Sequence, residues 1–147
     1  MVIIMKENVI VSITGHHMAD EEENTIQTEQ PGKYAFFQGK HIIRYEEYTE
    51  SGSDTPVSIP CMLKIDRENV ILSKKGAAPM KMHFSLGTAH DTLYQTPLGP
   101  LPISVRTSHL EINECEEKIT VDLTYRLHMN GDPVSDCRMT ISIRGSK

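Results

Sequence analysis

The sequence predicts an all-β protein, folded as a single antiparallel meander barrel of about eight to ten strands. Apolar and polar residues alternate in many short runs, and turn-forming residues separate the runs closely. Between Val57 and Tyr94, no helical period of about 3.6 residues persists for three turns. One-sided alternation puts one face of each strand in a core, and closing the sheet removes its exposed edges. A two-sheet sandwich is the alternative that alternation alone does not exclude.

The chain of 147 residues is expected to form one domain spanning 1–147, which can bury a core without disulfides. Its net charge of -5 and its isoelectric point near 5.8 exclude a general attraction to nucleic acid or to anionic membranes. Three widely spaced cysteines, Cys61, Cys115 and Cys137, fit a reducing compartment better than a disulfide framework. The apolar start from Met1 to Met5 is too short for a signal peptide or a membrane span. We therefore expect a cytoplasmic protein that has neither nucleic acid nor a membrane as a partner.

The first part of the chain predicts long extended segments. Alternating apolar residues predict a first strand from Asn8 to Thr14, which Gly15 ends. A second extended region follows, divided at Pro31-Gly32 and folded into a hairpin at Gln38-Gly39.

The middle of the chain predicts a loop followed by three strands. Residues 50–58 are the most loop-like stretch of the sequence. The run from Val57 to Ile65 alternates strictly, and the run from Val70 to Leu72 returns after a polar turn, which implies a hairpin. The apolar residues between Met80 and Leu86 share one parity and predict a further strand.

The stretch from Tyr94 to Leu101 is predicted to be a structural corner built on Thr96, Pro97 and Gly99. Pro97 fixes its own φ and has no amide hydrogen to donate, while Gly99 can adopt a positive φ. The arriving strand must therefore turn or bulge before the next one begins. Farther along, the apolar residues change parity at Ser108-His109, which predicts a β-bulge there.

Two cleanly alternating strands flank Asn130-Gly131 and predict the last hairpin. A simple two-residue turn would pair Leu123 with Arg138, which places apolar and charged side chains on the same face. An offset of one residue instead pairs Tyr125 with Cys137. We predict this offset, located in the turn or in a bulge beside it.

The run Tyr94-Gln95-Thr96-Pro97-Leu98-Gly99, with the alternating residues that follow it to Ile112, resembles the YwiB-like family of uncharacterised bacterial proteins. Tyr45-Glu46-Glu47 and the closing Met129-Asn130-Gly131 turn are similar to the same family. The resemblance covers nearly the whole chain, from Val9 to Ile143. It implies a calycin-type β-barrel, lipocalin-like in shape, in a family without an established activity. No catalytic residue carries over from the family, and the fold by itself hosts many functions.

Metal, phosphate and cysteine chemistry find little support in the sequence. The pair His16-His17 is read as loop residues, and the acidic run at 20–24 as a solvated loop or a single helical turn. Neither a Walker pattern nor GxGxxG occurs. Cys61 and Cys137 fall on the apolar parity of their strands, and the acidic neighbours of Cys115 disfavour a reactive thiolate. We predict no catalytic residue, no metal and no cofactor.

The adjacent carboxylates Glu46 and Glu47 should face opposite sides of one strand, so they do not form a glycosidase pair. The one that points into the barrel needs a partner, such as Arg44 or Tyr94. The sequence leaves open which of the two points inward.

The apolar interior offers the remaining candidate site. Methionines adapt to irregular shapes, and a barrel of about eight strands is either filled by its own side chains or keeps room for one small ligand. The residues expected to line a ligand site are Phe84, Tyr125, Leu127, Met129 and Met139, with Met62, Met80 and Met82 as further interior methionines.

The leading hypothesis for function is a non-enzymatic barrel that binds a small, largely apolar molecule. The alternative is a protein-interaction or structural module with a filled barrel, which forms a homodimer or docks a partner through an outer face or a strand edge. An enzyme ranks third.

Overall fold

The computed structural model describes residues 7–19, 22–49, 57–76 and 79–145. All regular secondary structure in these ranges is β-strand, and turns join the strands. The ten strands in these ranges are β1 (Asn8–Ala19), β2 (Glu22–Phe37), β3 (Lys40–Thr49), β4 (Val57–Ile65), β5 (Asn69–Lys74), β6 (Met80–Ser85), β7 (Ala89–Thr96), β8 (Gly99–Cys115), β9 (Lys118–Met129) and β10 (Asp132–Gly145).

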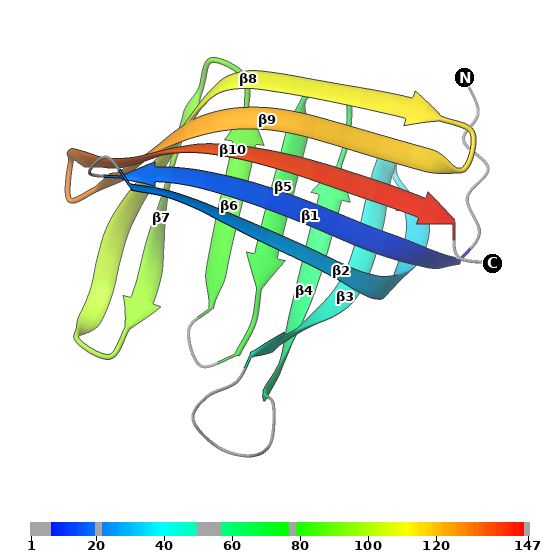
Figure 1. The fold of residues 1–147 in the computed structure, drawn as a ribbon, viewed down its shortest axis with the longest axis horizontal. Coiled ribbons are helices and arrows are strands. Elements are labelled where there is room, and N and C mark those ends of the chain that lie inside the picture. The colour runs from blue at the N-terminus through cyan, green and yellow to red at the C-terminus, as the bar shows by residue number, and fades with distance from the viewer. Residues whose placement is uncertain (1–6, 20–21, 50–56, 77–78, 146–147) are drawn as a thin grey trace.

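The strands form one antiparallel sheet in the order β6-β5-β4-β3-β2-β1-β10-β9-β8-β7. Strands β8, β9, β10, β1 and β2 make a front layer that crosses over β3, β4, β5 and β6 behind it (Figure 1). The two edge strands of the sheet, β6 and β7, contact each other, and β6 also contacts β8. The sheet therefore curls into a nearly closed barrel, which confirms the predicted fold class.

Strand β2 carries the chain from the front layer to the back layer. Its residues pair with β1 as far as Lys33, and from Gly32 onward they pair with β3. A Cβ at Gly32 would lie 2.9 Å from the carbonyl oxygen of Arg44 and 3.1 Å from the Val11 side chain. Only glycine allows this close approach of the neighbouring strands. Pro31-Gly32, expected to divide two strands, thus lies inside one continuous strand that bends.

An apolar core lies inside the barrel. The buried side chains come from one parity of each strand, and the register keeps them opposite one another, as where Leu63 pairs with both Ile43 and Leu72. The largest fully buried side chains are Phe84, Ile43, Leu63, Ile65, Ile119, Leu123, Ile141, Ile143, Val9, Val11, Val70 and Val105. Removing such side chains from water contributes about 25 cal/mol per Å² of apolar area, the main favourable term in folding.

The last hairpin has the predicted register, with Tyr125 opposite Cys137. Its turn is the two-residue Asn130-Gly131, with φ values of 51° and 85°, as a type I′ turn requires. A bulge between Pro133 and Ser135 supplies the offset of one residue. The turn chemistry and the hydrophobic pattern are both satisfied, because the bulge reconciles them.

The predicted corner and the second predicted bulge are also present. Pro97 and Leu98 form the turn that follows Thr96, and Gly99 begins β8 with a φ of 113°. A register shift lies between Thr107 and His109 in the β8–β9 pairing, where the apolar parity changes. Both features therefore follow from local turn and strand chemistry.

The first strand is longer than predicted. Strand β1 continues through Gly15, so His16-His17 lie in a strand and not in a loop. Part of the acidic run, residues 22–24, begins β2. Polar side chains on both faces hide the strand period here, whereas pairing with both β2 and β10 holds the backbone extended. The rest of that run, at 20–21, and most of the predicted loop, at 50–56, lie outside the described residues.

Candidate functional site

The five side chains expected to line a ligand site all belong to the interior. Phe84 and Tyr125 are buried with ring centroids 4.9 Å apart, and Met139 is buried beside them in the same core. Leu127 and Met129 are half-buried and pack against that core. Their part in binding a ligand stays a prediction, since ordinary core side chains pack in the same way.

A tyrosine–cysteine pair faces the interior on β3 and β4. Tyr45 is 6% exposed and lies opposite Cys61 in the register. The Cys61 thiol lies 3.4 Å from the carbonyl oxygen of Ile59 and 3.9 Å from Oε2 of Glu47. Among the described residues, the Tyr45 hydroxyl has only this weakly hydrogen-bonding thiol beside it. An unpaired buried hydroxyl costs about 1–3 kcal/mol. The Tyr45 hydroxyl is therefore available to a polar group bound in the barrel.

Glu47 is the inward-facing member of the adjacent carboxylates. Its Oε2 lies 2.9 Å from Nζ of Lys74, and each side chain is only about a quarter exposed. Glu46 points outward and accepts a hydrogen bond from the Tyr48 hydroxyl at 3.3 Å. The inward carboxylate thus has the partner that its position requires. That partner is Lys74, whereas the sequence suggested Arg44 or Tyr94.

A second tyrosine–cysteine pair lies on β9 and β10. Tyr125 is buried opposite Cys137, whose Sγ lies 3.2 Å from Nδ1 of His17 and 3.0 Å from Oγ of Ser135. Three strands, β1, β9 and β10, therefore bring polar atoms to the border of the apolar core. Sequence spacing did not reveal this cluster, because His17 and Cys137 are 120 residues apart.

The electrostatics of both pairs favour uncharged side chains. Burial raises the pKa of the Tyr45 hydroxyl far above its usual range, and the neighbouring Cys61 and Glu47 add to the effect. Burial, followed by the neighbouring Cys137, likewise raises the pKa of Tyr125. Burial and then Glu47 raise the pKa of the Cys61 thiol. The two tyrosines and Cys61 are therefore poor candidates for a base or a thiolate nucleophile.

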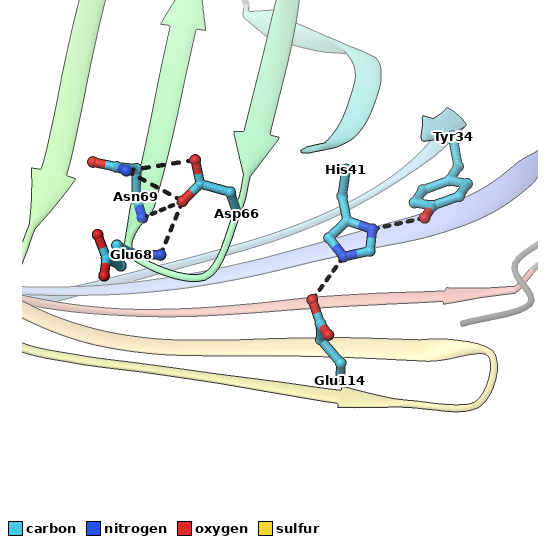
Figure 2. A network of polar contacts seen from close by, with 6 residues as sticks. All are labelled: Tyr34, His41, Asp66, Glu68, Asn69 and Glu114. Atoms are coloured by element: carbon cyan, nitrogen blue, oxygen red, sulfur yellow. Dashed lines mark hydrogen bonds and ion pairs between the residues drawn. The ribbon is translucent and has the colours of Figure 1, made fainter. Parts of the chain in front are cut away.

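A polar bridge crosses the interior at the end of the barrel where β2 turns into β3 (Figure 2). The Tyr34 hydroxyl lies 2.7 Å from Nδ1 of His41, and Nε2 of His41 lies 2.8 Å from Oε1 of Glu114. All three groups are satisfied when the tyrosine donates to Nδ1 and Nε2–H donates to the carboxylate. Because His41 is 3% exposed, the bridge ties β8 to β2 and β3 and leaves little capacity to bind anything else.

The turn between β4 and β5 carries a separate network, also drawn in Figure 2. Oδ1 of Asp66 accepts from the backbone amides of Glu68 at 2.9 Å and Asn69 at 2.8 Å. Burial acts to raise the pKa of Asp66, but these hydrogen bonds outweigh it and lower that pKa below its usual value. The network stabilises the turn, as an aspartate at this position commonly does.

Two histidines stack where the barrel closes between β6 and β7. The rings of His83 and His90 have centroids 3.8 Å apart and planes only 8° from parallel. Nε2 of His83 bonds to Oδ1 of Asn69 at 2.8 Å, whereas Nε2 of His90 is buried without a partner among the described residues. The pKa of His83 is lowered, first by burial and then by His90. The position of His83 in the stack therefore favours its neutral form.

A groove of about 990 Å³ lies on the outside of the barrel, over β3 to β6 and beside the bend in β2. Its described lining contains one acidic residue, Glu46, and the apolar Met62, which therefore lies outside the barrel and not within it. The lining also contains five cationic residues: Lys33, Arg44, Lys64, Lys75 and Lys81. The sequence shows them as scattered charges, of which only Lys75 has an adjacent cation, Lys74, and the strand register gathers them on one face.

Neither the groove nor a smaller hollow of about 620 Å³ over β7 to β9 is lined by the five predicted interior residues. In the described ranges, no group of three or more His, Cys, Asp or Glu side chains could hold a metal ion. His16 bonds to β2 and His17 to β10, so the adjacent histidines diverge. The described part of the chain contains no helix with the length and apolar character needed to cross a membrane.

Comparison with known proteins places the chain in a family. Residues 11–141 match the family described as Domain of unknown function (DUF1934). The uncharacterized β-barrel protein YwiB of Bacillus subtilis (strain 168) is 23% identical over 126 residues, which cover 86% of this chain and 85% of the relative. The crystal structure of the ywiB protein from Bacillus subtilis matches with a TM-score of 0.77 at 21% identity, covering 97% of this chain and 96% of that chain. The chain therefore belongs to the DUF1934 family, and its predicted resemblance to YwiB-like proteins is confirmed.

Proposed function

We propose that the protein is a non-enzymatic binding protein that holds a small, largely apolar molecule inside the barrel. The observation that carries the proposal is the Tyr45 hydroxyl, which is buried and has only the weakly hydrogen-bonding Cys61 thiol beside it among the described residues. Buried polar groups are nearly always paired in folded proteins, so one without a strong partner indicates a bound water or ligand. A ligand with one polar atom near Tyr45 and an apolar body elsewhere would satisfy the site.

Two further features support an interior ligand. Thr107, 4% exposed on β8, also has a buried hydroxyl without a partner in the described ranges. Barrel diameter grows with strand number, and the ten strands in the described ranges exceed the eight that side chains alone can just fill. The calycin-type, lipocalin-like class implied by the resemblance is part of this proposal, because such barrels hold one small ligand. Phe84, Tyr125, Leu127, Met129 and Met139 would supply apolar contacts.

A melting-shift screen tests the proposal with fatty acids, isoprenoids and aromatic metabolites. A ligand that binds only the folded protein raises its stability by about 2.7 kcal/mol at a hundred times its dissociation constant. We expect at least one compound to raise the melting temperature, and Tyr45→Phe to weaken that effect because the variant lacks the hydroxyl. The matched control is Tyr48→Phe, which makes the same chemical change on the outer face, where Tyr48 is 56% exposed.

Two outcomes would contradict the proposal. The first is a panel with no stabilising compound. The second is a stabilising compound that acts equally on the wild type and on Tyr45→Phe, since the ligand would then not use the hydroxyl. In the absence of a ligand, Tyr45→Phe should be neutral or stabilising, because it removes a polar atom without a strong partner from the core.

The second candidate function is dimerisation through a strand edge. Strand β2 pairs with β3 only from Gly32 onward, so the edge of residues 22–31 that faces away from β1 has no paired strand among the described residues. Ile26, on this segment, is 59% exposed. Exposed strand edges pair readily with a second chain. Analytical ultracentrifugation of the wild type and Ile26→Lys tests this, and a monomer at all concentrations would exclude it.

We also propose that the protein is cytoplasmic and acts without nucleic acid, a membrane or a cofactor. The three cysteines, two buried and one exposed, are all free, as expected in a reducing compartment. Fractionation of cells that carry the tagged protein tests the location, and recovery in an oxidising compartment would contradict it.

A further inference from the structure

The strand register arranges the cations of the outer groove around one centre. A single row of cross-strand neighbours runs from β2 to β6 through Lys33, Arg44, Met62, Ser73 and Lys81. Cations occupy both ends of the row, while a methionine and a half-buried serine occupy its middle. With strands about 4.8 Å apart, the backbones at Arg44 and Lys81 are separated by about 14 Å, a span that a small organic molecule can fill.

Two more lysines border the same centre along the strands. Lys64 lies two residues beyond Met62 on β4, and Lys75 lies two residues beyond Ser73, just past β5. The strands are antiparallel, so these lysines stand on opposite sides of the row, which agrees with the 3.0 Å bond from the Lys75 amide to the Pro60 carbonyl. Four cations therefore surround a floor of Met62 and Ser73.

These cations have no neutralising partners among the residues that the structure describes. Within the described ranges, Arg44, Lys64, Lys75 and Lys81 form no ion pair, and Lys33 bonds only to the amide oxygen of Asn8. Lys33 and Arg44 are directly opposite in the β2–β3 register, an arrangement of like charges that destabilises a sheet. A bound anion would relieve this repulsion.

The concentration of positive charge contrasts with the rest of the molecule. The chain has 15 Lys and Arg against 20 Asp and Glu, yet the groove has five cations and one described carboxylate. Its volume of about 990 Å³ is at the upper end of the range for small-molecule sites. Extended nucleic acid fits less well, because the acidic surface beyond the groove would repel its phosphates.

We propose that the groove binds a small organic polyanion, centred over Met62 and Ser73. The ligand carries two or more phosphate or carboxylate charges, which the surrounding Lys and Arg side chains contact, and a partly apolar body that lies on Met62. The Ser73 hydroxyl is placed to donate to one of its oxygens. The cations of the site lie on the outer face of the sheet, whereas Tyr45 and Cys61, which also line the groove, belong to the buried core.

Isothermal titration calorimetry at low salt tests the proposal with three probes: inorganic pyrophosphate, citrate and adenosine diphosphate. Pyrophosphate and citrate distinguish phosphate from carboxylate recognition, and adenosine diphosphate adds an apolar body. We expect at least one probe to bind, with an affinity that falls as salt rises. The double variant Arg44→Gln/Lys81→Gln should weaken binding about tenfold or more, because it removes both charged ends of the row.

The control is Lys118→Gln, an exposed lysine at the start of β9 and outside the groove, which should change affinity by less than about twofold. A second double variant, Lys64→Gln/Lys75→Gln, should also weaken binding, and it replaces the first if the first fails to fold. Failure of all three probes to bind would overturn the proposal. An equal loss in Lys118→Gln, or a single-stranded oligonucleotide that binds more tightly than adenosine diphosphate, would also overturn it.

Discussion

Replacing Gly32 with alanine should destabilise the barrel by about 2–3 kcal/mol, the usual cost of overpacking. The added methyl carbon would lie 2.9 Å from the Arg44 carbonyl oxygen, 3.1 Å from the Val11 side chain and 3.4 Å from Cβ of Tyr45. Backbone and branched core atoms cannot rotate away, so the strands must separate where β2 leaves β1 for β3. In a domain of this size the loss lowers the melting temperature by about 5–10 °C.

Urea denaturation of Gly32→Ala, read by circular dichroism, measures this loss, and Gly15→Ala is the matched control. Gly15 also lies inside a strand, but its added Cβ would meet only Nε2 of His17 at 3.7 Å, an ordinary contact. Gly15→Ala should therefore be neutral or stabilising by up to about 1 kcal/mol, because alanine reduces the entropy of the unfolded chain. Equal stability of Gly32→Ala and the wild type would refute the bend at Gly32.

Two further predictions concern stability. Gly99→Ala should lower the free energy of unfolding by about 1 kcal/mol, because Gly99 has a φ of 113° that alanine adopts only with strain. Space is not the cause, since no atom lies within 4 Å of an added Cβ. An unchanged urea midpoint would show that this position does not require glycine. Because burial and His90 lower the pKa of His83, the unfolded state binds more protons, so stability should be complete above about pH 6.5 and decrease below it. Lys81 and Lys40 add to this effect and Asp66 opposes it. His83→Gln should show a weaker decrease below about pH 6.5, and identical pH profiles would contradict the assignment.

Strand order and register follow from sequence where alternation is strict. The final hairpin shows this, because core burial specified the pairing of Tyr125 with Cys137 despite a turn that alone suggests another register. The same rule fails after Ile13 on β1, where polar residues occupy both faces and only tertiary pairing holds the strand. The prediction from Pro31-Gly32 was also wrong. Such a dipeptide normally ends a strand, but in this chain it lies inside β2, where the strand bends.

The candidate sites depend on contacts that local patterns do not encode. The interior position of Phe84 and Met139 follows from parity, but the lack of a strong partner for the Tyr45 hydroxyl does not, since its environment comes from several strands. The groove is similar, because Lys33 and Lys81 meet on one face only after four strand pairings have been fixed. The pattern of a single strand predicts which face a side chain occupies, but not which distant side chains share that face.

Native mass spectrometry of the freshly purified protein tests most directly whether the barrel holds a small molecule. The wild type should appear partly as a complex with one added mass in the range of a small metabolite, and the complex should be reduced in Tyr45→Phe but retained in Tyr48→Phe. Unbound protein alone in the wild type, together with no stabilising compound in the melting screen, would contradict interior binding and leave edge pairing by β2 as the supported function.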